Sequence, residues 1–235
     1  MVAPLAGRVA LITGASRGLG AAAAIELARL GAHVVITART QGGLEETDDT
    51  IRAAGGTATL LPLDLREPEK VEAIAPSIVA RFERLDILVH AAGVLGKLTP
   101  VSHATAEDRT EVLAVNTIAA WRLIQSCETP LRRSDAGRAV FVTDIRASEP
   151  FAYWGPYGAS KAAAANLVLS WAGEVATTPL RVNLFDPGPM RTRLRATAFP
   201  GEDPASVSPA DDAAAALAEL CLPDENRHGK VISRR

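Results

Sequence analysis

The chain has 235 residues, of which 48% are hydrophobic and 22% are charged, as is typical of a globular protein with a large buried core. Its 25 basic and 27 acidic residues leave a net charge of -2, so no basic excess favours nucleic acid or an anionic membrane as a partner. No apolar run is long enough to cross a bilayer and the start of the chain lacks a signal-peptide pattern, so we expect a cytoplasmic protein.

Short β-branched runs alternate with longer helix-like stretches along the chain. Several runs are apolar on both faces, as in the central strands of a parallel sheet that is covered on both sides. The expected strands are residues 9–13, 34–37, 58–63, 87–89, 139–142, 181–185 and 231–232. Without a linker or repeat, this pattern predicts one α/β domain over residues 1–235, a doubly wound Rossmann-type parallel sheet of about seven strands with helices on both faces.

Helix signals fill the intervening segments at residues 21–30, 68–82 and 159–176. Residues 187–209 differ, because they contain five prolines and two glycines. We expect an irregular insertion there, either a mobile flap on the substrate side of a binding site or a plain surface excursion. The two cysteines, Cys127 and Cys221, match no metal-ligand spacing or redox pair and are interpreted as structural thiols, so no metal site is expected.

A glycine-rich turn follows the first predicted strand and opens a helix. Gly14 permits a tight turn, Gly18 lets the backbone approach a pyrophosphate, and Gly20 lets the helix pack closely on the strand. Three glycines alone would fit a flexible loop, but the position between strand and helix favours dinucleotide binding at the helix N-terminus. The predicted contacts at this turn are Gly14, Ser16, Arg17, Gly18, Leu19 and Gly20.

The end of the second strand distinguishes NAD from NADP. An acidic residue there would bind the adenosine ribose and repel a 2′-phosphate, whereas this strand ends in Ala38 and Arg39. Arg39 and Arg17 offer forked cationic donors to a phosphate, which favours NADP(H), although both would also suit a solvated surface. Asp64, at the end of the third strand, could meet the adenine edge or cap the next helix.

Tyr157 and Lys161 are four residues apart at the start of a predicted helix, so both side chains lie on one face. A neighbouring ammonium lowers the pKa of a phenol and brings its proton exchange nearer to neutral pH. Such pairs also occur by chance on solvated helices.

With the glycine turn, Asn116 and Pro187-Gly188, this pair makes the chain resemble the short-chain dehydrogenase/reductase family over almost its whole length. The resemblance implies that Tyr157 is the general acid/base, that Lys161 binds the nicotinamide ribose, and that Asn116 holds a proton-relay water. It also implies a homo-oligomer, a dimer or tetramer, paired through helices at about residues 106–127 and after Tyr157.

Further cofactor contacts follow from the same resemblance. The segment 90–93 matches the family's motif at the end of the fourth strand, with His90 as a structural variant of its first position. Thr192 matches the residue that hydrogen-bonds the nicotinamide carboxamide. The additional cofactor-binding residues implied are Ala92, Gly93, Pro187, Gly188, Met190 and Thr192.

One departure from the family stands thirteen positions before Tyr157, where Asp144 replaces the catalytic serine. An ionised aspartate there would repel the negative charge that develops on a substrate oxygen. Three interpretations remain: Asp144 stays protonated and donates the hydrogen bond itself, Thr143 supplies the hydroxyl instead, or the protein has lost carbonyl reduction.

The leading hypothesis is an NADP(H)-dependent oxidoreductase that interconverts a carbonyl and an alcohol on a small, apolar substrate, with Tyr157 as general acid/base. The alternative is a non-catalytic or regulatory NADP(H)-binding protein, because of Asp144. Four apolar residues near the tyrosine would line a substrate pocket or belong to the core: Leu95, Phe151, Tyr153 and Trp154.

Overall fold

Seven strands form one sheet in the order β3-β2-β1-β4-β5-β6-β9, and every neighbouring pair is parallel. The computed structural model describes residues 3–234 of the chain. The strands are β1 (Val9–Thr13), β2 (His33–Ala38), β3 (Thr57–Pro62), β4 (Ile87–His90), β5 (Arg138–Val142), β6 (Arg181–Asp186) and β9 (Val231–Ser233). The predicted single-domain, doubly wound α/β fold is confirmed.

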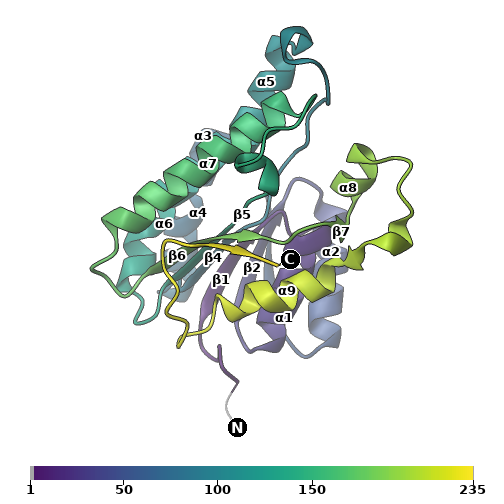
Figure 1. Cartoon of the computed structure of the whole chain (residues 1–235). Coiled ribbons are helices and arrows are strands. Elements are labelled where there is room, and N and C mark those ends of the chain that lie inside the picture. Colours follow the sequence, from purple (N-terminus) through teal and green to yellow (C-terminus); the bar gives the residue numbers. More distant parts are fainter. Residues whose placement is uncertain (1–2, 235) are drawn as a thin grey trace.

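Helices cover both faces of the sheet (Figure 1). One face carries α1 (Gly18–Arg29), α2 (Gln41–Ala53) and α9 (Ala210–Glu219). The other carries α3 (Pro68–Glu72), α4 (Ile74–Phe82), α6 (Ala119–Arg133) and α7 (Gly155–Glu174). The helix α5 (Ala106–Leu113) packs beside α7 and extends beyond the sheet (Figure 1). A short π-helical turn, Ala114–Ile118, joins α5 to α6. No helix within residues 3–234 is long and apolar enough to cross a membrane.

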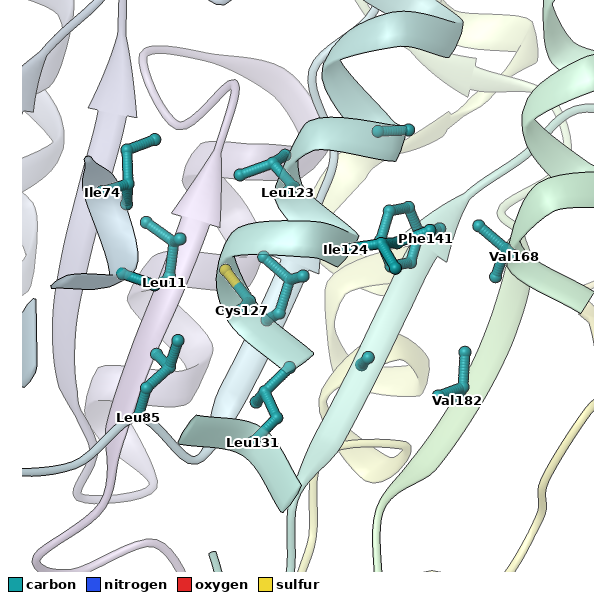
Figure 2. Packing of buried hydrophobic residues seen from close by; sticks show 14 of the residues in the cluster. Leu11, Ile74, Leu85, Leu123, Ile124, Cys127, Leu131, Phe141, Val168 and Val182 are labelled. Atoms are coloured by element: carbon teal, nitrogen blue, oxygen red, sulfur yellow. The ribbon is translucent and has the colours of Figure 1, made fainter. Parts of the chain in front are cut away.

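The core consists of two layers separated by the sheet, because neighbouring side chains of a strand point to opposite faces. On β1, Leu11 joins the layer under α4, α6 and α7, whereas Ile12 joins the layer under α1, α2 and α9. Figure 2 shows the first layer, where Leu123 and Cys127 of α6 lie toward Leu11 and Ile124 lies at Phe141. Burial raises the pKa of the Cys127 thiol to about 12, which fits the structural role expected from the sequence.

One helix predicted as continuous, residues 68–82, is divided into α3 and α4 at Ala73. Pro76 explains the break, because it has no N–H for the carbonyl of Glu72 and its ring crowds that carbonyl. The hydroxyl of Ser126 on α6 donates to the Glu72 carbonyl at 2.9 Å instead. The break therefore leaves no buried acceptor unsatisfied at this point.

The segment 187–209 is more ordered than the predicted irregular insertion. It contains β7 (Met190–Arg191), α8 (Arg193–Ala198), a 3-10 turn at Pro204–Ser206 and β8 (Ser208–Pro209), with β7 and β8 paired in a two-stranded sheet. Thr192 caps α8 by accepting the Arg195 N–H at 3.2 Å, and Arg195 forms two hydrogen bonds with Glu202. Local capping and an ion pair thus order a proline-rich segment that has little apolar periodicity.

Candidate active site

A cavity of about 920 Å³ lies at the carboxyl ends of the strands, where doubly wound sheets bind their ligands. It runs from the glycine-rich turn after β1 to the end of β5 and the start of α7, and α8 covers it from the side. Every predicted cofactor-binding or catalytic residue except Asn116 lines it: Gly14, Ser16, Arg17, Gly18, Leu19, Gly20, Arg39, Asp64, Ala92, Gly93, Asp144, Tyr157, Lys161, Pro187, Gly188, Met190 and Thr192.

The glycine-rich turn has the close approaches that the sequence predicts. A Cβ on Gly14 would lie 2.7 Å from the backbone of Ala92, and one on Gly20 would lie 2.3 Å from the Gly14 carbonyl oxygen. Gly18 has a φ of +57° and lines the cavity with Leu19 at the start of α1. This first turn of α1 contains no acidic residue and no side-chain cap, so its N–H groups face the cavity and fit an anionic ligand such as a pyrophosphate.

Two unpaired arginines stand at one end of the cavity. Arg17 and Arg39 both line it, both are exposed, and neither guanidinium forms a hydrogen bond or ion pair with any residue in the range 3–234. Asp64 lies beside them, but its carboxylate is held by Arg66 through bonds of 2.6 to 3.1 Å. The Arg66 guanidinium and backbone lower the Asp64 pKa, so this carboxylate is ionised near neutral pH.

The alternative role of Asp64 as a helix cap is wrong. The residue preceding α3 in the N-cap position is Glu67, and the Asp64 carboxylate accepts the Arg66 N–H at 2.9 Å within the turn before it. Its possible contact with an adenine stays a prediction.

Tyr157 and Lys161 lie on the buried side of α7, which begins at Gly155 rather than at the predicted residue 159. Lys161 Nζ is 6.0 Å from the centroid of the Tyr157 ring and donates to the Val142 carbonyl oxygen at 3.0 Å. Burial lowers the Lys161 pKa to about 8, against an opposing effect of the Asp144 carboxylate. The ammonium is thus fixed at the end of β5, on the same side of the helix as the phenol.

Asp144 directs one carboxyl oxygen at the phenol. Its Oδ2 is 3.3 Å from the Tyr157 hydroxyl, while its Oδ1 accepts the backbone N–H of Arg146 at 2.8 Å. Thr143, the neighbouring candidate, also lines the cavity, but its hydroxyl is buried and has no hydrogen-bond partner within residues 3–234. The carboxyl group of Asp144, not the hydroxyl of Thr143, therefore stands beside Tyr157.

The predicted fall in the Tyr157 pKa is contradicted. Burial raises the pKa of this phenol, and the Asp144 carboxylate raises it further through its charge and hydrogen bond. The Asp186 carboxylate acts in the same direction, and the nearby Arg146 guanidinium opposes it. The spacing of Tyr157 and Lys161 predicted their common face, but it carried no information about burial or about the acid that comes from β5.

The side chain of Asn116 is committed to the protein. Its amide donates to the Val94 carbonyl and to the Ser160 hydroxyl, both at 2.9 Å, and its oxygen accepts the Val94 N–H. Asn116 lies in the π-helical turn and fixes the chain after β4 to the first turns of α7. The structure therefore gives this amide a positioning role, and both of its protons are already used.

The chain is similar to known proteins over most of its length. The family profile for short chain dehydrogenases matches residues 8–203. The chain belongs to this family.

The uncharacterized oxidoreductase YciK of Escherichia coli (strain K12) is 36% identical over 208 residues, which cover 87% of this chain and 82% of YciK. A putative short chain dehydrogenase structure from Pseudomonas syringae has a TM-score of 0.95 at 34% identity, covering 99% of this chain and 96% of that one. A second, from Shigella flexneri 2a strain 301, was solved in complex with NADP. It has a TM-score of 0.94 at 33% identity and covers 99% of both chains.

In this short-chain dehydrogenase, His90 has the structural role expected for it. Its Nδ1 is 2.8 Å from the Thr13 hydroxyl, and its ring packs on Phe141 with centroids 5.5 Å apart. Burial, with a contribution from the Lys161 charge, lowers the His90 pKa to about 3. The imidazole therefore stays neutral under physiological conditions and ties β1 to β4.

The apolar cluster beyond Tyr157 contains part of the pocket that the sequence suggested. Leu95, Trp154 and Tyr157 are buried together, and Leu194 and Phe199 of the α8 segment pack against them. Phe151 and Tyr153, by contrast, are more than half exposed. Arg146, two residues after Asp144, also lines the cavity and is not predicted from the sequence, because a single arginine in a loop carries no periodic or motif signal.

Proposed function

We propose that this dehydrogenase is an NADP(H)-dependent oxidoreductase that interconverts a carbonyl and an alcohol on a small substrate with an apolar body. The observation that carries the proposal is a single cavity with two distinct ends. One end presents the unpaired Arg17 and Arg39, and the other brings together Tyr157, Lys161 and Asp144.

The preference for NADP(H) rests on the arginine end of the cavity. Two unpaired guanidinium groups fit a ribose 2′-phosphate, and β2 ends in Ala38 without an acidic side chain that would repel it. The NADP complex of the Shigella flexneri relative agrees with this choice. Lys161 and the backbone beside Gly93 and Thr192 are proposed to hold the nicotinamide end.

Arg39→Ala should weaken NADPH binding by about 10- to 100-fold, because it removes charge-assisted hydrogen bonds to the phosphate. The Kd of NADH, which lacks that phosphate, should change by less than about threefold. Titration of protein fluorescence with each cofactor measures both values. Arg29→Ala, on the far end of α1, is the control. Equal losses of NADPH and NADH affinity would refute the assignment of Arg39.

When bound, NADPH supplies a hydride to the carbonyl carbon. Tyr157 is proposed to supply the proton to the carbonyl oxygen, because burial, the largest cause of its raised pKa, keeps the phenol protonated whichever form Asp144 takes. Lys161 is proposed to hold the nicotinamide ribose as an ammonium. The segment 187–209 is proposed to form the substrate side of the cavity and to exclude water, because Leu194 and Phe199 cover the apolar cluster.

Asp144 is proposed to act in its acid form as the second hydrogen-bond donor to the substrate oxygen. The 3.3 Å separation of Asp144 Oδ2 from the Tyr157 hydroxyl supports this role, because a substrate oxygen placed beside the two groups could accept a hydrogen bond from each. A neutral carboxyl group also avoids repulsion of the charge that develops on that oxygen.

Asp144→Asn should keep turnover within about tenfold of the parent protein, because the amide retains an N–H donor at nearly the same position. Asp144→Ala should lose about 10²- to 10³-fold in kcat, since it removes the donor. In both the parent protein and Asp144→Asn, the rate should decline as the pH rises through about 8 and Lys161 loses its proton. Loss of turnover in Asp144→Asn would contradict the acid-form role.

The alternative, a non-catalytic NADP(H)-binding protein, is favoured by one observation, the hydrogen bond that the Tyr157 hydroxyl donates to the Asp144 carboxylate. It predicts NADPH binding without turnover in the parent protein and in Asp144→Asn. Asp144→Ser would then create activity.

A homo-oligomer is also proposed for this protein. Leu113, Ile118 and Trp121 are large apolar side chains that are 40% to 49% exposed along the segment from α5 to α6. Their position fits the helical pairing that family resemblance implies.

A further inference from the structure

The substrate end of the cavity contains a cation that forms no ion pair with residues 3–234. Arg146 lies in the 3-10 turn Ile145–Ala147 that follows Asp144, and it lines the cavity near Trp154 and Tyr157. Its guanidinium carbon is 4.0 Å from the centroid of the Phe151 ring and 5.1 Å from that of the Trp154 ring. The charge is therefore held against two aromatic faces at the mouth of the apolar cluster.

No carboxylate neutralises this guanidinium within residues 3–234. Asp144 accepts the backbone N–H of Arg146 and forms no ion pair with its side chain. The Arg146 Nε is buried and has no hydrogen-bond partner. A buried donor without a partner is costly, and a forked guanidinium satisfies this need best with a planar carboxylate.

The other arginines around the cavity differ from Arg146. Arg195 stacks on Phe199 at 3.9 Å, but Glu202 neutralises it through hydrogen bonds of 2.6 and 2.7 Å. Arg191 and Arg193 flank Thr192 and are exposed, and within residues 3–234 neither guanidinium packs on an aromatic ring. Arg146 alone among them is both unpaired and next to Tyr157 and Trp154.

We propose that the substrate carries a carboxylate, which Arg146 binds, on an aromatic or apolar body that packs against Trp154 and Phe199. The aromatic contacts of Arg146 hold the guanidinium in place, which lowers the entropy lost when a carboxylate binds. This inference rests on the proposed carbonyl reductase function and specifies its substrate class. The substrate carboxylate would also reduce the net positive charge of a site that contains both Arg146 and Lys161.

Kinetic discrimination between two matched aldehydes tests the inference. In the parent protein, kcat/KM with NADPH should be at least about tenfold higher for 4-carboxybenzaldehyde than for its methyl ester. Arg146→Met keeps an unbranched apolar stem against Phe151 and removes the charge, so it should lower kcat/KM for the acid by about 10- to 100-fold and leave the ester nearly unchanged. Lys97→Met, an exposed lysine outside the cavity lining, is the control for net charge and should preserve the preference.

A binding measurement separates this inference from the proposed reaction. Calorimetric titration with 4-(hydroxymethyl)benzoate and with its methyl ester, at saturating NADPH, needs no turnover, because an alcohol and the reduced cofactor cannot react with each other. Tighter binding of the acid that is lost in Arg146→Met and partly kept in Arg146→Lys supports the inference even if no aldehyde is reduced. Equal affinity for acid and ester in the parent protein would overturn it. An equal loss of both ligands in Arg146→Met would also overturn it and would assign Arg146 to the support of the 148–154 loop.

Discussion

Tyr157→Phe is expected to lower kcat for NADPH-dependent carbonyl reduction by about 10²- to 10⁴-fold, the range for loss of a general acid. The change removes one oxygen atom and leaves the buried ring against Trp154, whose centroid lies 5.6 Å away. The free energy of unfolding and the Kd of NADPH should therefore change little. Steady-state kinetics, cofactor titration and thermal unfolding of the same preparation measure the three quantities.

The protein contains its own matched control for this experiment. The chain has two tyrosines, and the other one, Tyr153, lies four residues before Tyr157 and is 59% exposed. Its backbone carbonyl, not its hydroxyl, accepts the Thr99 N–H at 3.1 Å. Tyr153→Phe should keep full activity. Substantial turnover in Tyr157→Phe, or an equal loss in both variants, would remove Tyr157 from its proposed role.

Gly14→Ala should both destabilise the protein and abolish NADPH binding. Gly14 has a φ of +70°, which costs an alanine about 1–2 kcal/mol, and its new Cβ would lie 2.7 Å from the Ala92 backbone. The backbone of the loop after β4 must move to relieve that contact. We therefore expect a total loss of about 2–4 kcal/mol in the free energy of unfolding. The same movement would displace the turn that faces the cofactor. Chemical denaturation and NADPH titration measure the two effects.

Gly173→Ala provides the opposite result with the same chemical change. Gly173 lies within α7, and a Cβ there would meet no atom within 4 Å. The variant should gain about 0.5–1 kcal/mol of stability from helix propensity and bind NADPH normally. If Gly14→Ala unfolded at the same denaturant concentration as the parent protein, the close packing assigned to the turn would be wrong.

The sequence predicts the fold well because its signals are local. Each strand of the sheet is a short β-branched run with helix signals on either side, and the glycine-rich turn has its spacing within one stretch of chain. The common face of Tyr157 and Lys161 is likewise a property of one helix. These features follow from periodicity and from backbone sterics, without knowledge of distant neighbours.

The features that the sequence did not predict depend on residues far apart in the chain. The Tyr157 pKa rises because of burial and because β5 delivers Asp144 to the start of α7. Asn116 loses its free amide to Val94 and Ser160, which come from two other segments. The order within residues 187–209 combines a local cap and the Arg195–Glu202 ion pair with the pairing of β7 and β8. Such contacts become visible only once the chain is folded.

Transfer of deuterium from NADPH labelled at the reactive carbon of its nicotinamide tests directly whether the protein reduces a carbonyl with Tyr157 as the general acid. An aldehyde such as 4-carboxybenzaldehyde should yield an alcohol with deuterium at the former carbonyl carbon. Mass spectrometry of the product should detect this label with the parent protein and with Tyr153→Phe, but only at a trace level with Tyr157→Phe. If saturating labelled NADPH bound to the parent protein and no carbonyl compound in a panel of acids and esters acquired deuterium, the proposed carbonyl reduction would be contradicted.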